Sequence, residues 1–146
     1  MTTSGAAADG PTPRAPGTSE PASRIVRLSP AELGFLRQGR LLGRLATSDD
    51  EGQPHVVPVG WSYDEALGTF DISGRDFAAT RKYRNVLANP RAALVIDDVL
   101  PPWQPRAVHV QGPAQAVPAD PATGAPALIR ITPTKVTSWG LADPSN

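Results

Sequence analysis

From residue 41 to residue 139 the sequence is a succession of short segments in which apolar and polar residues alternate, separated by Gly, Pro or acidic residues. A period of two places alternate side chains on opposite faces of a β-strand, and β-branched residues favour that conformation. We therefore predict six strands, at residues 41–47, 55–61, 69–73, 91–97, 106–117 and 128–139. Turn residues separate the first three, which predicts a meander. Gly112-Pro113 indicates a bulge or a bend in the middle of the fifth strand, and Pro133 requires an edge position or a break in the sixth.

Two segments carry the longer period of a helix. Ser29-Pro30-Ala31-Glu32 is a capping box with Pro at the first helical position, which predicts a short helix over residues 30–38. Residues 78–88 place four apolar side chains near one face and end at Asn89-Pro90, which predicts a second helix. Six strands and two short helices predict a mainly β protein, a small antiparallel barrel with the helices outside it.

The first 24 residues differ in composition from the rest of the chain. They contain no Val, Ile, Leu or aromatic residue and consist mostly of Ala, Thr, Ser, Gly and Pro. Such a segment cannot bury enough apolar surface to offset its ordering entropy. We expect a disordered arm at residues 1–24, a barrel domain at residues 25–141 and a short tail at residues 142–146.

Charge and composition exclude several classes of protein. The 14 basic residues balance 14 acidic ones, whereas nucleic-acid binding usually needs a strongly basic face. The absence of Cys excludes a disulfide scaffold, a thiolate metal site and a Cys nucleophile. No apolar run approaches the roughly 20 residues that span a bilayer, and the N-terminus lacks a signal-peptide pattern. We expect a cytoplasmic protein without nucleic-acid or membrane partners. Only two of the basic residues are Lys, a bias that favours a GC-rich genome such as that of an actinobacterium.

One local charge imbalance indicates an anion site. Arg81, Lys82, Arg84 and Arg91 lie in the stretch between Asp76 and Asp97, which contains no acid. The second predicted helix begins in this stretch, and a helix N-terminus presents unpaired N–H groups and the positive end of its dipole. Arg81 and Lys82 would lie in its first turns, where both side chains reach phosphate oxygens. A solvated helix face is the alternative.

Motifs for other chemistry are missing. The two histidines, His55 and His109, have no partner at metal-ligand spacing, so we expect no metal site. The sequence contains no G-x-S-x-G, G-x-G-x-x-G or Walker motif. Trp61, Trp103 and Trp139 fit either core packing or a wall against a planar ring, and the pattern alone does not choose between them.

The order of motifs resembles the pyridoxamine 5′-phosphate oxidase-like split β-barrel family of flavin and deazaflavin proteins. The resemblance covers residues 30–141 and rests on segments that are specific only together. They are GRLAT at residues 43–47, PHVVPV at 54–59, FDISG at 70–74, RKYRNV at 81–86, NPRAALV at 89–95 and RITPTKVTSWG at 130–140.

This resemblance implies a homodimeric split barrel with the cofactor between the subunits. The cofactor ring would lie against the second strand and the phosphate at the start of the second helix, with Trp139 reaching across from the partner chain. The cofactor-binding residues that it implies are Val56, Val57, Pro58, Val59, Gly60, Ile72, Ser73, Gly74, Arg81, Lys82 and Trp139.

Within the family, the closing RITP and SWG segments and the Asp97-Asp98 pair are similar to a branch of oxidoreductases that depend on coenzyme F420. The resemblance implies hydride transfer from the reduced deazaflavin to an activated double bond of a small planar substrate, with Tyr63, His55 or solvent as proton donor. FMN is the alternative cofactor, and Arg40, Arg44 or Arg75 could receive the additional acidic tail of F420. A non-catalytic protein that binds a flavin, F420 or haem is a further alternative.

Overall fold

The computed structural model describes residues 25–142 of the 146-residue chain. The predicted N-terminal arm, residues 1–24, lies outside the described residues, as do residues 143–146 of the predicted tail. Within the described part, no helix is long and apolar enough to cross a membrane.

The described chain forms an antiparallel sheet of eight strands with two α-helices and one short 3₁₀ helix. In chain order the elements are α3 (Pro30–Leu36), β1 (Gly43–Ser48), β2 (Pro54–Val59), β3 (Ser62–Asp64), β4 (Thr69–Ile72), η1 (Phe77–Ala79), α4 (Arg81–Ala88), β5 (Arg91–Leu100), β6 (Gln104–Val117), β7 (Leu128–Ile131) and β8 (Lys135–Trp139). The predicted mainly β, antiparallel fold with two short α-helices is confirmed.

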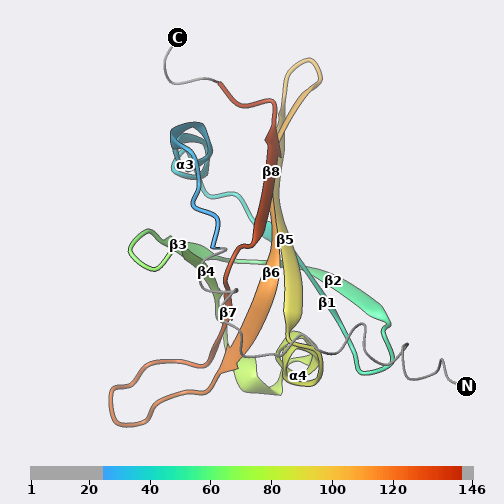
Figure 1. The fold of residues 1–146 in the computed structure, drawn as a ribbon, viewed down its shortest axis with the longest axis vertical. Helices are drawn as coiled ribbons and strands as arrows, with labels where there is room; N and C mark the ends of the chain where they lie inside the picture. The colour runs from blue at the N-terminus through green and yellow to red at the C-terminus, as the bar shows by residue number, and fades with distance from the viewer. Residues whose placement is uncertain (1–24, 143–146) are drawn as a thin grey trace, which may run out of the picture.

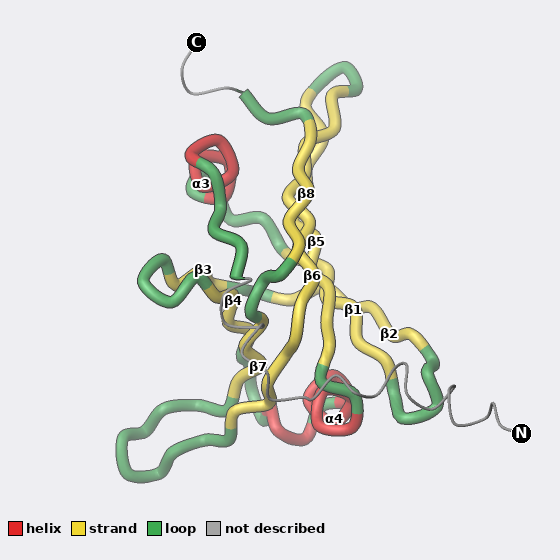
Figure 2. Tube along the Cα trace, viewed as in Figure 1, coloured by secondary structure: helices red, strands yellow, loops and turns green. Residues whose placement is uncertain are grey.

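The long β5–β6 ladder is the axis of the molecule, and the two helices lie at its opposite ends (Figure 1). The strand order is β2-β1-β5-β6-β7-β4-β3, and β8 pairs with the first half of β6. Among the described residues β2 therefore pairs only with β1, and β3 only with β4. The two ends of the sheet separate as in an open, split barrel (Figure 2).

The count of strands differs from the predicted six because the last predicted strand divides in two and because β3 lies in a segment for which no strand was predicted. The segment at residues 55–61 stops at Val59, and the chain turns through Trp61, whose Nε1 donates to the Leu41 carbonyl over 2.8 Å, before β3 begins. Pro133 divides the last segment into β7 and β8, as its missing N–H requires. The predicted meander is wrong in its third member, because β4 pairs with β3 and β7 and not with β2.

Gly112 marks the point at which β6 exchanges one neighbour for another. Residues 107–111 of β6 pair with β8, and residues 114–117 pair with β7. A Cβ at Gly112 would lie 2.0 Å from the Thr132 carbonyl oxygen, so only glycine permits this crossing. Gly112-Pro113 therefore lies where β6 changes its neighbour, and β6 continues through it as one strand.

The core lies on the inner face of the sheet, toward which every second side chain of the strands points. Its fully buried side chains include Leu45, Phe70, Ile72, Leu94, Ile129 and Ile131. The opposite face of β2, β1, β5, β6 and β8 carries the other half of the alternation. It includes partly exposed apolar side chains, among them Val56 and Trp139.

Candidate functional site

Helix α4 begins at the first residue of the predicted cationic pair, and its N-cap, Thr80, directly precedes the pair. Residues 77–88 do not form one helix, because Thr80 interrupts them: its Oγ1 donates to the Phe77 carbonyl over 2.7 Å and accepts from the Tyr83 amide over 3.3 Å. Thr80 is thus the N-cap, and the Arg84 amide bonds to the Thr80 carbonyl. The amides of Arg81 and Lys82 have no hydrogen-bond partner among the described residues and can bind an anion.

The side chains of Arg81 and Lys82 add two positive charges to these amides. Neither takes part in an ion pair within residues 25–142, and α4 has no acid in its first turn. The Lys82 ammonium lies 5.5 Å from the centre of the Phe77 ring. Arg84 points elsewhere, since its Nη1 donates to the Ala79 carbonyl over 2.6 Å. Two unpaired cations beside two free amides fit the phosphate of a nucleotide-like cofactor.

Asp49, in the turn between β1 and β2, is an acid whose charge Arg81 affects. Its pKa is lowered, first by hydrogen bonds from the backbone amides of Gln53 and Glu51 and to a smaller extent by the positive charge of Arg81. The two amides bond to Asp49 Oδ1 over 2.8 and 2.9 Å. Asp49 is therefore occupied by its own turn, and Arg81 remains available to an anion.

The strand expected to carry the cofactor ring is an edge strand with two different faces. Val56, Pro58 and the following Gly60 are exposed, with 65% of Val56 accessible, whereas Val57 is half-buried and Val59 is buried. Because the outer edge of β2 has no strand partner among the described residues, its main-chain groups remain available to a ligand.

The inner face of β2 carries an unsatisfied histidine nitrogen. His55 is the register partner of Thr47, and its Nδ1 is buried without a hydrogen-bond partner. Thr47 Oγ1 already accepts from Asn85 Nδ2 of α4 over 3.1 Å. An orphaned buried nitrogen is costly unless a ligand or a water satisfies it. The other predicted proton donor, Tyr63, lies on β3 and packs against Phe70 with 4.7 Å between ring centres.

The remaining predicted site residues lie in different environments. Ile72 is completely buried in the core, so its side chain faces away from any ligand, while Ser73 and Gly74 are exposed in the link between β4 and η1. Arg44 is paired with Asp97 over 2.8 Å, whereas Arg40 and Arg75 are exposed.

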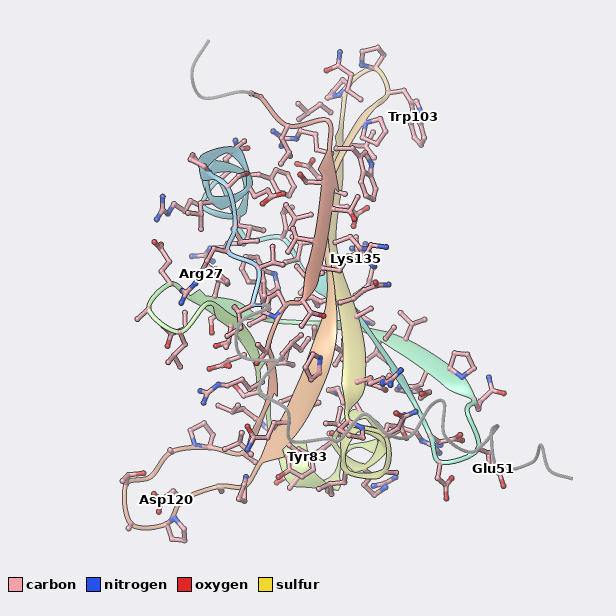
Figure 3. The ribbon with its side chains drawn as sticks, in the orientation of Figure 1. Arg27, Glu51, Tyr83, Trp103, Asp120 and Lys135 are labelled. Carbon is pink, nitrogen blue, oxygen red and sulfur yellow. The ribbon has the colours of Figure 1, made fainter. Side chains whose placement is uncertain are left out.

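The three tryptophans have three different environments. Trp61 packs in the core region against Phe70, and Trp103 is 74% exposed at the tip of the β5–β6 hairpin (Figure 3). Trp139 is 48% exposed and ends β8, beside Ala107 of β6. Since β8 leads away from α4 toward the α3 end of the molecule, one chain does not bring Trp139 to Arg81 and Lys82 (Figure 1).

A groove that the sequence did not predict opens where β1 leaves β5. The two strands pair from Gly43 with Ile96 to Ala46 with Ala93 and then part. The groove beyond that point has a volume of about 700 Å³, and its lining includes Ala46, Ser48, Arg91, Ala93, Gln111 and Thr134. Asn89 Nδ2 donates to Ser48 Oγ over 2.7 Å and ties the end of β1 to the link between α4 and β5. The signal in the sequence is two small residues on the outer face, Ala46 and Ala93. The pattern of a single strand does not show that these two residues become neighbours.

Comparison with known proteins gives a family and several relatives. The profile of the family described as pyridoxamine 5′-phosphate oxidase matches residues 28–140. The chain is similar to a 5a,11a-dehydrotetracycline/5a,11a-dehydrooxytetracycline reductase from Streptomyces rimosus subsp. rimosus. The two are 44% identical over an alignment of 117 positions, and the match covers 75% of this chain and 81% of that protein.

Solved structures have the same fold. A crystal structure of a FAD-binding protein from Mesorhizobium loti has a TM-score of 0.58 and 24% sequence identity, and the match covers 76% of this chain and 92% of that one. A structure described as an F420 reductase has a TM-score of 0.53 and 25% identity, covering 70% of this chain and 94% of the other.

Proposed function

The chain belongs to the pyridoxamine 5′-phosphate oxidase family, and on that premise we propose that it is a reductase that uses coenzyme F420, with FMN as the alternative cofactor. The observation that carries the proposal is the start of α4, where Arg81, Lys82 and two free amides form a phosphate site with no anion of its own among the described residues. F420 and FMN both carry a phosphate on a ribityl chain, so this site fits either.

The protein's own contribution would be binding and orientation. Arg81 and Lys82 would hold the phosphate, and the free edge of β2 from Val56 to Gly60 would hold the ring through main-chain groups. Ser73 and Gly74 would flank the chain between them. When bound and reduced, the coenzyme would supply a hydride. One carbon of the substrate's double bond would accept it, and the other would accept a proton.

Two residues are candidate proton donors. His55 lies on the strand that would hold the ring, and its buried Nδ1 has no partner among the described residues. His55 shares the inner face of the sheet with Thr47, and Tyr63 packs against Phe70 in the β3–β4 hairpin. Solvent remains the third source. A His55→Gln variant that binds cofactor normally but reduces substrate more slowly would identify His55 as the donor.

The reductase from Streptomyces rimosus supports a substrate of the same kind. At 44% identity, we propose that this chain likewise reduces a double bond conjugated to a carbonyl group in a planar, fused-ring compound. Such a reaction needs positioning and exclusion of water more than a strong acid–base pair.

A homodimer is part of the proposal. Trp139 is far from α4 in its own chain, and the outer sheet face on which it lies is partly apolar. Packing of the part of this face around Trp139 against a second copy would bring Trp139 of one protomer toward the cofactor of the other and would leave the groove between β1 and β5 open. Sedimentation of the purified protein with and without cofactor tests this part separately.

The experiment that tests the function is a turnover assay. The purified chain is mixed anaerobically with reduced F420, or with reduced FMN, and 5a,11a-dehydrooxytetracycline, and oxidation of the coenzyme is followed together with the mass of the product. We expect a product two hydrogen atoms heavier and faster turnover with F420. Binding of coenzyme without any turnover would instead indicate a carrier or storage protein.

A further inference from the structure

We propose that the groove between β1 and β5 binds the substrate, and that this substrate presents a flat ring system with an anionic, enolised dicarbonyl edge. This inference rests on the proposed reductase function and adds to it the place and the chemistry of substrate binding. The inference rests on the residues that form the floor and the rim of the groove and on the strand and helix next to it.

The floor of the groove is made of small side chains. Ala46 of β1 and Ala93 of β5 are register partners and both line it. Val56 of β2 is the next residue in the same cross-strand row and lies on the same face. Side chains this small leave room above the sheet, and the surface that they form suits the face of a ring system rather than a branched or globular ligand.

The rim of the groove is rich in donors and positively charged. Arg91 and Gln111 line it, and Lys135 is the register partner of Gln111 on β8, beside the long ladder (Figure 3). All three side chains are exposed, and within residues 25–142 none has an ion pair or side-chain hydrogen bond.

The acid on the same sheet face is already paired. Asp97 accepts a hydrogen bond from Arg44 over 2.8 Å, so it does not neutralise the rim. A planar guanidinium binds two adjacent oxygens at once, as in a carboxylate or an ionised β-dicarbonyl. The rim therefore favours a ligand with adjacent, negatively charged oxygens.

The position of the groove connects it with the proposed cofactor site. Val56, which borders the floor, belongs to the strand that would hold the cofactor ring. Ser48, at the end of the groove, is tied to the C-terminal end of α4 through Asn89, while the N-terminus of the same helix carries Arg81 and Lys82. A substrate in the groove would thus lie beside a ring on β2 without competing for the phosphate site.

The test measures binding directly, with tetracycline as the probe, because it has four fused rings and an ionisable β-dicarbonyl edge. Wild-type protein is titrated with tetracycline, and separately with F420, and compared with Ala93→Leu, which fills the floor, and Arg91→Gln, which removes the rim charge. The matched controls are Ala122→Leu in the exposed β6–β7 loop and Arg37→Gln, whose charge lies beside α3. Thermal unfolding and sedimentation of each variant check its fold and its assembly.

We expect both groove variants to weaken tetracycline binding at least about tenfold while F420 binding changes less than about twofold, and both controls to match wild type. Equal tetracycline binding in the groove variants would overturn the placement, even if turnover with F420 stands. Loss of assembly in Ala93→Leu with unchanged tetracycline binding would also overturn it, because the groove would then hold a second copy of the chain. Tetracycline binding with no turnover on any reduced coenzyme would leave the groove in place and contradict the reductase function alone.

Discussion

The two helices of this protein lie at opposite ends of the β5–β6 ladder, and the charged side chains near them differ in whether they are paired. At the α3 end, Arg106 donates to both carboxylate oxygens of Asp98 over 2.9 and 2.6 Å and to Gln38 over 3.1 Å. Its guanidinium also lies 4.9 Å from the centre of the Phe35 ring. Ser138 donates to Glu32 over 2.6 Å, and Glu32 also closes the capping box. These charges and hydrogen bonds hold the helix to the sheet.

At the α4 end, Arg81, Lys82 and Arg91 have no ion-pair partner within the described residues. Two of these cations occupy the first turn of a helix, where the dipole disfavours positive charge. Such an arrangement costs stability unless an anion is bound. The paired charges at the α3 end maintain the fold, and the unpaired cations at the α4 end support our proposal that this end binds an anionic ligand.

The largest expected effect comes from Phe35→Ala at the α3 end. Phe35 is 2% exposed and supports the Arg106 side chain, so its truncation leaves a cavity. We expect a loss of about 3–5 kcal/mol in the free energy of unfolding. Urea denaturation measures this loss, and titration of the folded fraction should give unchanged F420 affinity. A large change in affinity without loss of stability would reverse the roles of the two ends.

Lys82→Ala at the α4 end should lower the affinity for the cofactor without lowering the stability of the fold. We expect cofactor binding to weaken by about 1.5–3 kcal/mol, because a charge-assisted hydrogen bond to phosphate is removed. The unfolding free energy without ligand should stay the same or rise slightly, since a cation leaves the helix N-terminus. Fluorescence titration and urea denaturation measure the two quantities, with Arg37→Gln as the control. Unchanged affinity would remove Lys82 from the site.

Acid should weaken the α3 end in a defined way. The hydrogen bonds from Arg106 hold the pKa of Asp98 below its usual value. Asp98 therefore contributes stability that is present above its unfolded-state pKa of about 3.9 and is lost as the pH falls through the lower, folded-state pKa. The difference in unfolding free energy between wild type and Arg106→Gln should shrink as the pH falls from neutral to about 2. A difference that stays constant over this range would contradict the role of Asp98.

The smallest effect is expected from Ser138→Ala, which removes one hydrogen bond to Glu32. We expect a loss of about 0.5–1.5 kcal/mol in the free energy of unfolding. The capping box of α3 should survive, because Glu32 keeps its hydrogen bond with the Ser29 amide. Thermal unfolding is sensitive enough to detect the change. A greater loss than for Phe35→Ala would show that β8 and not the apolar core holds α3.

Features governed by adjacent residues could be predicted from the sequence. The capping box at Ser29 and Glu32 and the break at Pro133 depend on local backbone chemistry, and the structure agrees with both of them. The pairing of β4 with β7 could not be predicted, because it joins segments that are far apart in the sequence. The division of the second helix at Thr80 was missed because its apolar period continues across the cap.

The candidate site also has features that the local sequence predicts and features that it does not. The charge imbalance around Arg81 and Lys82 is local, and it pointed to the start of α4 without any structure. The inward orientation of Ile72, the distance of Trp139 from α4 and the groove at Ala46 and Ala93 depend on how strands are arranged in space. A strand pattern shows which residues share a face, but it does not show which strands become neighbours.

The most direct test of the central claim, that the start of α4 binds the phosphate of a flavin-type cofactor, is a titration of cofactor-free protein with F420 and with FMN at matched salt. Fluorescence is followed for wild type and for Lys82→Ala. The account predicts tight F420 binding by wild type, weaker FMN binding, and a loss of affinity for both in the variant. Binding of neither cofactor, or equal binding by wild type and variant, would contradict it.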